Sequence, residues 1–282
     1  MSFSKAFKYP LNSFGDVFSL VLILTIAVAV FLGVALNSYD WTPILAEIYD
    51  LDPNEYYIGE PEPLNGMAAF GLLGALVVFI VEGFWLSGYS IEVIRAVMSE
   101  VELMPKIDFG RNVKDGIYLF ASSLVYWIIF FVIIVVSMLA HKLTQANAIV
   151  TVVAVVVTVV AVALMGWAYL IGMARFAVDR DYRSAWQIRE NLLRARKHWP
   201  NGASLLLYMV ALSFVYGIFR GIVEGIFGGV TGMIGITLSI VIYYFFNLFQ
   251  HFSTQHLIAH FAIEIGLSTD NVIQEKAKVD YA

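Results

Sequence analysis

The sequence predicts an all-α integral membrane protein with six transmembrane helices and two cytoplasmic amphipathic helices. Three observations predict this fold class: the composition, six long apolar segments, and the distribution of lysine and arginine. Hydrophobic residues make up 60% of the chain and charged residues only 14%, whereas a soluble domain is about one quarter charged. The mean hydropathy is +0.79. We therefore interpret residues 1–282 as a single transmembrane helical domain.

Six segments are apolar enough to cross a bilayer core of about 30 Å, which takes roughly 20 helical residues. The predicted spans are Val17–Leu36, Gly66–Trp85, Ile117–Leu139, Ile149–Ile171, Ala203–Ile222 and Thr231–Phe249. The first is longer than a signal-peptide core, and no clear small-x-small cleavage site follows it, so we expect a retained helix. A glycine-rich segment separates the last two spans.

The basic residues give the orientation. With alternating spans, fifteen of the 17 lysines and arginines fall on the side of the N-terminus, and only Lys142 and Arg220 fall on the other side. Lysine and arginine are enriched in cytoplasmic segments. The sequence therefore predicts a multi-pass protein of the plasma membrane with both termini in the cytoplasm.

The first outer segment, residues 37–65, contains seven acidic residues and no basic one. Its simplest interpretation is a solvated loop with a short interfacial helix around Pro43–Tyr49. A docking surface for an extramembrane partner and a calcium site are alternatives. For calcium, Asp50, Asp52 and Asn54 only loosely match an EF-hand, because the turn glycine is missing.

Two inner stretches have the apolar periodicity of amphipathic helices. In the first, Ser90–Asp115, apolar residues recur at helical spacing and Pro105 is expected to end the helix. In the second, Asp181–Pro200, the expected apolar stripe consists of Ala185, Ile188, Leu192 and Trp199. Ser184 and Gln187 have the spacing of a capping box. Such helices lie at the membrane interface or pack against the inner ends of the spans.

The pattern of span, amphipathic stretch and span occurs twice, over residues 66–138 and 150–221. Gly88 aligns with Gly172, and Gly116 lies near Gly202 in this superposition. Few residue identities support it, so the parallel internal repeat is a hypothesis that rests on pattern.

Polar residues at membrane depth are candidates for function. Glu82 lies within the second span, where a structural hydrogen bond or ion pair, a proton or ion relay, and simple exposure near the interface are all open. Arg220 and Glu224 lie near the end of the fifth span, at the i, i+4 spacing of an ion pair along one helix.

Glycines recur every four residues at the end of the fifth span, a spacing that lets two helix backbones approach closely. The candidate helix-packing glycines are Gly217, Gly221, Gly225, Gly229 and Gly232. Packing within the chain, contact with another subunit and a re-entrant segment are the three interpretations.

Basic residues of the inner stretches are candidates for contact with anionic lipid headgroups. These are Arg95, Arg189, Arg194, Arg196 and Lys197. The run from Arg189 to Lys197 flanks a span, so lipid and orientation explain it better than nucleic acid does.

The sequence predicts no metal site, no cofactor and no catalytic centre. The chain has no cysteine, and its sequence contains no recognisable phosphate-binding glycine loop or serine–histidine–carboxylate arrangement. His256 and His260 have the i, i+4 spacing of a metal-binding pair but lack an HExxH pattern. Interfacial or packed histidines are the simpler interpretation. We expect that the protein is not an enzyme.

Several short motifs carry a resemblance to a known family. They are Phe7-Lys8-Tyr9-Pro10, Gly88-Tyr89-Ser90, Arg95, Met104-Pro105, Asp115-Gly116 and His256-Leu257. With these motifs the chain resembles the membrane family called domain of unknown function 4013, from about Phe7 to Phe261. The resemblance implies a prokaryotic multispanning protein without an assigned activity. Met104 stands where leucine is more usual in that family.

Together these features favour a non-catalytic membrane subunit or scaffold that packs against partner membrane proteins, against itself or against lipids. A small-solute or ion transporter with Glu82 on its pathway is the first alternative. A lipid-binding or lipid-handling membrane module is the second.

Overall fold

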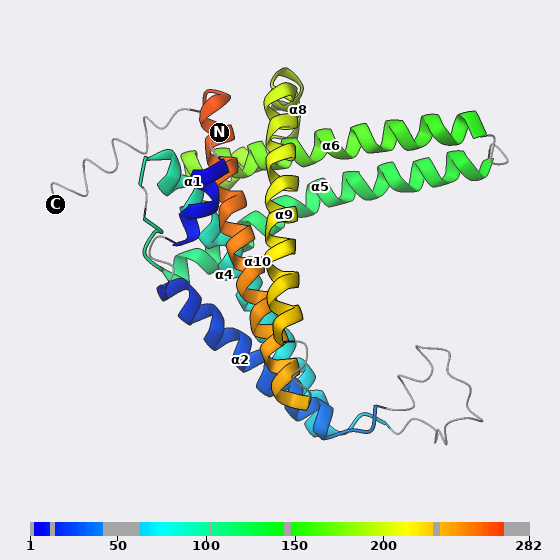
Figure 1. Ribbon diagram of the computed structural model, residues 1–282. Helices are drawn as coiled ribbons and strands as arrows, with labels where there is room; N and C mark the ends of the chain where they lie inside the picture. Colours follow the sequence, from blue (N-terminus) through cyan, green and yellow to red (C-terminus); the bar gives the residue numbers. More distant parts are fainter. Residues whose placement is uncertain are drawn as a thin grey trace. The chain divides into compact units, whose positions relative to one another are not determined.

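A computed structural model of the protein describes residues 3–11, 15–41, 63–101, 103–143, 148–227 and 232–267. These residues form helices and no strand (Figure 1). The helices are α1 (Phe3–Lys8), the 3-10 helix η1 (Tyr9–Leu11), α2 (Gly15–Asn37), α4 (Gly66–Met98), α5 (Phe109–Leu143), α6 (Ala148–Asp179), α7 (Tyr182–Trp186), α8 (Ile188–Lys197), α9 (Trp199–Phe227) and α10 (Gly232–Glu264).

Five of the described helices are long and apolar enough to cross a membrane: α2, α4, α5, α6 and α9. They correspond to the first five predicted spans. The sixth predicted span, Thr231–Phe249, lies on α10, but Thr231 and the side chains of 232–241 are outside the described residues. The all-α membrane fold class is thus confirmed, while the number six remains a prediction. The acidic loop lies mostly outside the described residues, from 42 to 62.

The chain divides into two compact units, and the division falls within α4. The smaller unit, Gly15–Gly83, pairs α2 with the first part of α4. Gly71 and Gly74 permit this pairing, because a Cβ at Gly71 would lie 2.6 Å from the backbone nitrogen of Ala35 and one at Gly74 would overlap the ring of Phe31. Small residues at such positions let helix backbones approach.

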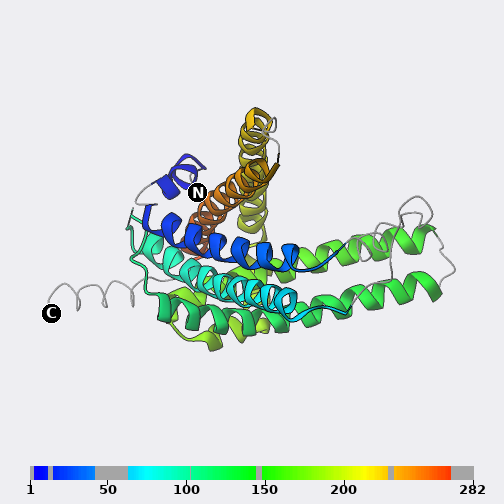
Figure 2. The same ribbon diagram turned by 90° about the horizontal axis from the view of Figure 1, so that it is seen from below.

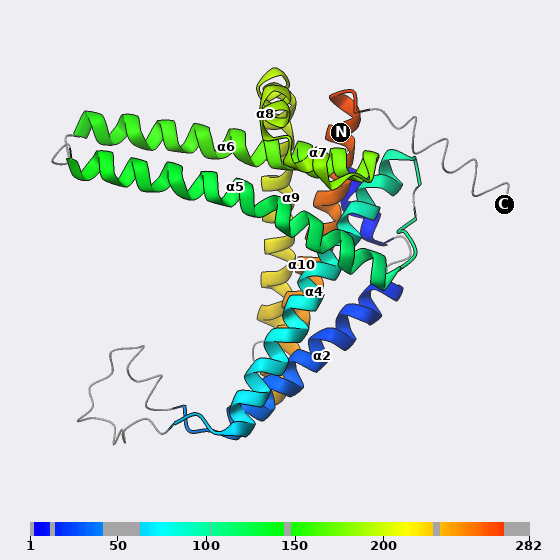
Figure 3. The ribbon, with the colours of Figure 1, turned by 180° about the vertical axis from the view of Figure 1, so that it is seen from behind.

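The larger unit, Met1–Phe14 with Phe84–Ala282, contains the other helices. α5 and α6 form an antiparallel hairpin, which Figures 2 and 3 show from two sides. The hydroxyl groups of Ser137 and Thr158 hydrogen-bond across it at 2.6 Å. α9 packs along α10, where the Tyr216 and Ser253 hydroxyls lie 2.8 Å apart.

Large apolar side chains cover the outer surface of the hairpin. Phe131 and Met138 are each 67% exposed, and Val152 is 62% exposed. Soluble proteins rarely expose apolar patches of this extent, whereas hydrocarbon is the matching solvent for a helix with all its backbone groups bonded internally. The exposed surface therefore agrees with a membrane location.

The first amphipathic stretch is not a separate helix, which corrects the sequence-based expectation. α4 continues from the second span to Met98 and ends before Pro105. Its end is a Schellman motif: Glu100 has φ 60°, Glu100 N–H donates to Val97 O and Val101 N–H donates to Ala96 O. The helix continues past Gly88 because a single glycine weakens a helix without ending it.

The second amphipathic stretch is divided in two at Gln187, between α7 and α8. Asp181 caps α7 by accepting a hydrogen bond from Arg183 N–H, so the predicted capping box of Ser184 and Gln187 is wrong. Pro200 does not end this stretch but stands in the first turn of α9, where a missing N–H costs nothing. Trp199, expected in the apolar stripe, is 58% exposed.

Candidate functional site

Among the described glycines of the larger unit, the two with the least room for a side chain lie where α4 meets α5. A Cβ at Gly88 would overlap the carbonyl group of Asn112, and a Cβ at Gly116 would overlap the carbonyl group of Phe84. Both obstacles are backbone atoms, so no side-chain rotation relieves the overlap. We call Gly88, Glu92, Arg95, Asn112 and Gly116 the first junction.

A buried ion pair stabilises the first junction. The Arg95 guanidinium lies 2.9 Å from the Glu92 carboxylate, and its Nε donates to Ala177 O on α6 at 2.8 Å. Arg111 approaches the same Glu92 carboxylate at 3.5 Å. Arg95 is 7% exposed, so its predicted contact with lipid headgroups does not fit this structure. Its guanidinium joins α4 to α6 instead.

Asn112 is fully buried in the first junction, yet neither atom of its side-chain amide has a hydrogen-bond partner among the described residues. A buried polar group without a partner is costly. Its position follows from the glycine contact, because the backbone of Asn112 lies directly against Gly88.

A second buried asparagine holds the second amphipathic stretch against the hairpin. Asn191 of α8 donates to the Tyr126 hydroxyl at 3.0 Å and to Ser184 O at 3.1 Å, and it accepts from Arg175 at 2.9 Å. Tyr126 in turn donates to Ala185 O at 2.9 Å. We call Tyr126, Arg175, Ser184, Ala185 and Asn191 the second junction. It joins α5, α6, α7 and α8.

The remaining basic candidates lie on α8. Arg189, Arg196 and Lys197 are exposed, as headgroup contact requires. Arg194 pairs with Glu190 at 3.2 Å, and Arg175 approaches the same carboxylate at 3.3 Å. The outer surface of α8 therefore retains three exposed cations.

The predicted glycine face of α9 is open in the described structure. At Gly217, Gly221 and Gly225, a Cβ would meet nothing within 4 Å. Gly229 lies outside the described residues. Gly232 begins α10, but the side chains around it along that helix are not described. Packing within the chain, the first of the three interpretations, is not what these three described glycines show.

Arg220 and Glu224 form the predicted pair, with 3.4 Å between Nε and Oε1. Arg220 also lies over the ring of Tyr243 at 5.0 Å, a cation–π geometry. Both charged side chains are more than one third exposed. The contacts are those of an ion pair at the helix surface.

Glu82 is buried in α4, at 6% exposure, and its Oε2 has no hydrogen-bond partner among the described residues. No ion pair of Glu82 appears in the described part of the chain, so the structural salt bridge considered from the sequence has no support. A relay remains an open hypothesis.

The histidines of α10 have different surroundings. His251 Nε2 lies 2.6 Å from Ser90 Oγ of α4. The rings of His256 and His260 lie 4.6 Å apart, and Tyr9 packs against His256 at 5.0 Å. In the described part of the chain, no group of three metal-binding side chains occurs.

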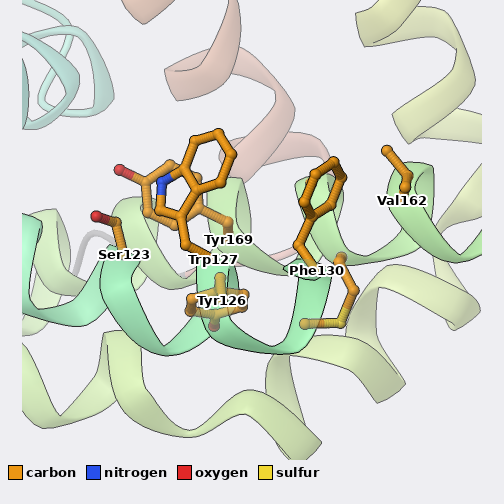
Figure 4. A pocket seen from close by; sticks show the side chains of 8 residues that line it. Ser123, Tyr126, Trp127, Phe130, Val162 and Tyr169 are labelled. Carbon is orange, nitrogen blue, oxygen red and sulfur yellow. The ribbon is translucent and has the colours of Figure 1, made fainter. Parts of the chain in front are cut away.

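An apolar pocket of about 330 Å³ lies between α5 and α6. Figure 4 shows Trp127 and Phe130 on one helix and Val162 and Tyr169 on the other. The Tyr126 hydroxyl at its edge is already bonded in the second junction. The pocket fits an apolar chain and offers little chemistry for catalysis.

Sequence reasoning missed the residues that hold the helices together most closely. Asn112 and Asn191 carried no recognisable motif. In the sequence, Gly88 and Gly116 serve only to align the two halves of the repeat. One glycine lies before and the other after the connection between α4 and α5, and this arrangement is the signal that indicates a contact between the two helices. The observed contacts do not test the repeat itself, which stays a prediction.

The family described as protein of unknown function (DUF4013) matches residues 71–227, more than half of the chain. The match is shorter than the resemblance expected from the sequence, since Phe7–Pro10 and His256-Leu257 fall outside it. No curated protein and no solved structure matches the sequence.

Proposed function

This chain belongs to the DUF4013 family of proteins of unknown function, and on that premise we propose that it is a non-catalytic subunit of a plasma-membrane assembly. Its termini face the cytoplasm, as the basic residues favour. The open face of α9 binds a transmembrane helix of a partner protein or of a second copy.

The single observation that carries this proposal is the open space that the described residues leave at Gly217, Gly221 and Gly225. Each glycine weakens a helix by about 1 kcal/mol relative to alanine. A glycine every four residues is useful where another helix backbone comes close. Exposed apolar side chains flank the glycines: Phe214 at 70%, Ile222 at 54% and Ile226 at 69%. The opposite side of α9 already packs on α10 through Tyr216.

The chain has no cysteine, so a cysteine introduced for cross-linking is the chain's single thiol. A Gly221→Cys variant, oxidised in native membranes, should form a disulfide with a second copy or with a partner that carries a cysteine. Val157→Cys is the matched control, because Val157 is 59% exposed on the hairpin and outside the proposed face. Gly221→Leu should reduce the mass of the complex purified in mild detergent. A wild-type monomer without co-purifying protein would overturn the proposal.

The transporter alternative depends on Glu82, whose buried carboxylate oxygen is without a partner in the described structure. Buried carboxylates in membrane helices are common on proton and ion pathways. Wild type and Glu82→Gln should be compared for ion and small-solute flux in proteoliposomes. Flux that Glu82→Gln abolishes would favour transport over the subunit proposal; an absence of flux in both would end the alternative.

A further inference from the structure

A cavity of about 770 Å³ with a mixed polar and apolar lining lies in the larger unit, at the end where the chain begins. Figure 1 shows α1 beside the last turns of α10, and the cavity is lined by α1, η1, α10, the end of α4 and the residues that follow it. Lys5 and Lys8 come from α1, Tyr9 from η1, and His256 and His260 from α10. The cavity is separate from the glycine face of α9.

We propose that this cavity binds a phosphate group, which Lys5, Lys8 and His256 recognise together. The group belongs either to the headgroup of an anionic lipid or to a soluble phosphate ester. Lysine ammonium groups are point charges that bind phosphate oxygens, and a neutral imidazole adds one N–H donor.

His256 is a second feature of the cavity, apart from the two lysines. His256 is 6% exposed, and its Nδ1 has no hydrogen-bond partner among the described residues. Buried imidazole nitrogens are normally bonded. His256 also lines the cavity, so a polar ligand bound there lies beside this ring.

The charges around the cavity favour an anion over a metal cation. Burial first, then His260 and Lys5, lower the pKa of His256 to about 4; burial and Lys5 also lower the pKa of His260. Lys5 therefore acts on both imidazoles. A metal cation would be repelled by the same ammonium group, and a phosphate would be attracted.

The surroundings of the two lysines also include groups with negative charge or partial charge. Glu100 also lines the cavity, and Glu264 raises the pKa of His260. The carbonyl groups of Ala96 and Val97 at the end of α4 are already occupied by the N–H groups of Val101 and Glu100. The lining thus includes a carboxylate, Glu100, as well as the two lysines, and two of the nearby carbonyl groups have their own donors.

The test uses the full chain in an uncharged detergent, with two probes: glycerol phosphate and dihexanoyl phosphatidic acid. Binding is measured by calorimetry and by the shift in thermal unfolding. Lys5→Met/Lys8→Met should weaken binding at least about tenfold, since two lost charge contacts amount to roughly 1.4 kcal/mol. Arg189→Gln/Arg196→Gln removes the same charge from α8 and should leave binding unchanged. Lys5→Arg/Lys8→Arg, which keeps the charge, should retain it.

Each outcome decides the proposal. The proposal is supported if one or both probes bind and if binding is lost only in the lysine variant. The probe that binds then identifies a lipid or a soluble source of the phosphate group. No binding at millimolar probe, or an equal loss in the α8 control, overturns it. Micromolar zinc binding that His256→Gln abolishes and the lysine variant leaves intact also overturns it, in favour of a cation site. Unfolded variants are recognised by their elution and apo melting temperature, and Lys5→Arg/Lys8→Arg then provides the comparison.

Discussion

The first and second junctions each contain a fully buried asparagine, and the two side chains differ in their hydrogen-bond partners. Asn191 has a partner for its carbonyl oxygen and for its nitrogen. Asn112 has none for either among the described residues. The second junction is therefore specified by side-chain hydrogen bonds, whereas the first is specified by backbone contact at two glycines and by the Glu92–Arg95 ion pair. The buried asparagine therefore contributes hydrogen bonds to the second junction and none among the described residues to the first.

The largest expected loss of stability comes from disturbing the close backbone contact at the first junction. Gly88→Ala adds a Cβ that overlaps the Asn112 carbonyl group, so α4 and α5 must separate. Overpacking of this kind costs about 3 kcal/mol or more, measured as the free energy of unfolding in detergent titrations. Gly166→Ala on α6 is the control, because a Cβ there meets nothing within 4 Å. It should stabilise the helix slightly. Equal behaviour of the two variants would contradict the close contact.

Breaking the ion pair should have the next largest effect. Arg95→Met keeps the length of the side chain but removes its bonds to Glu92 and Ala177 O. A buried charge without its partner costs 3–5 kcal/mol. Arg111 remains 3.5 Å from Glu92, so we expect about 2 kcal/mol. The loss should shrink in Glu92→Gln/Arg95→Met, since both buried charges of the pair are then removed together. A double variant as unstable as the sum of the single variants would argue against the pair.

The two asparagines allow a direct comparison with one substitution. Asn191→Leu leaves the Arg175 and Tyr126 groups without this partner and should cost about 1–2 kcal/mol. Asn112→Leu removes an amide that has no described partner, so it should be neutral or stabilising. Thermal unfolding of both variants in the same detergent measures the difference. A larger loss for Asn112→Leu than for Asn191→Leu would reverse the distinction between the junctions.

The sequence predicted the helical membrane fold because long apolar segments have few alternatives in lipid. It predicted element ends less well. α4 runs through Gly88 to a Schellman motif at Glu100, a residue type that seldom adopts positive φ. The second stretch is divided at Gln187, and Asn191 donates to Ser184 O across the division, a contact that no local pattern encodes.

The candidate sites were predictable only where spacing alone decides a contact, as for Arg220 and Glu224. Apolar periodicity cannot distinguish a surface that faces lipid from one that faces another helix. For this reason the glycines of α9 form a clear sequence motif, yet no described helix packs closely against them. The isolated Gly88 and Gly116, in contrast, form the close contact between α4 and α5. The cavity of Lys5, Lys8 and His256 joins opposite ends of the chain, which residue spacing does not reveal.

The smallest expected effect concerns the edge of the second junction. Trp186 donates from Nε1 to Ser122 Oγ, and Trp186→Phe removes that bond while keeping an aromatic ring. Ser122 still donates to Tyr118 O at 2.8 Å, so no buried hydroxyl is left without a partner. The cost should therefore be near the lower end for a hydrogen bond, about 0.5 kcal/mol. In a double-mutant cycle with Ser122→Ala, a coupling energy of about that size is expected. A coupling of zero would mean that this hydrogen bond adds nothing to the attachment of α7, which then rests on the bonds of Asn191 and Tyr126 and on the stacking of Tyr182 against Tyr118.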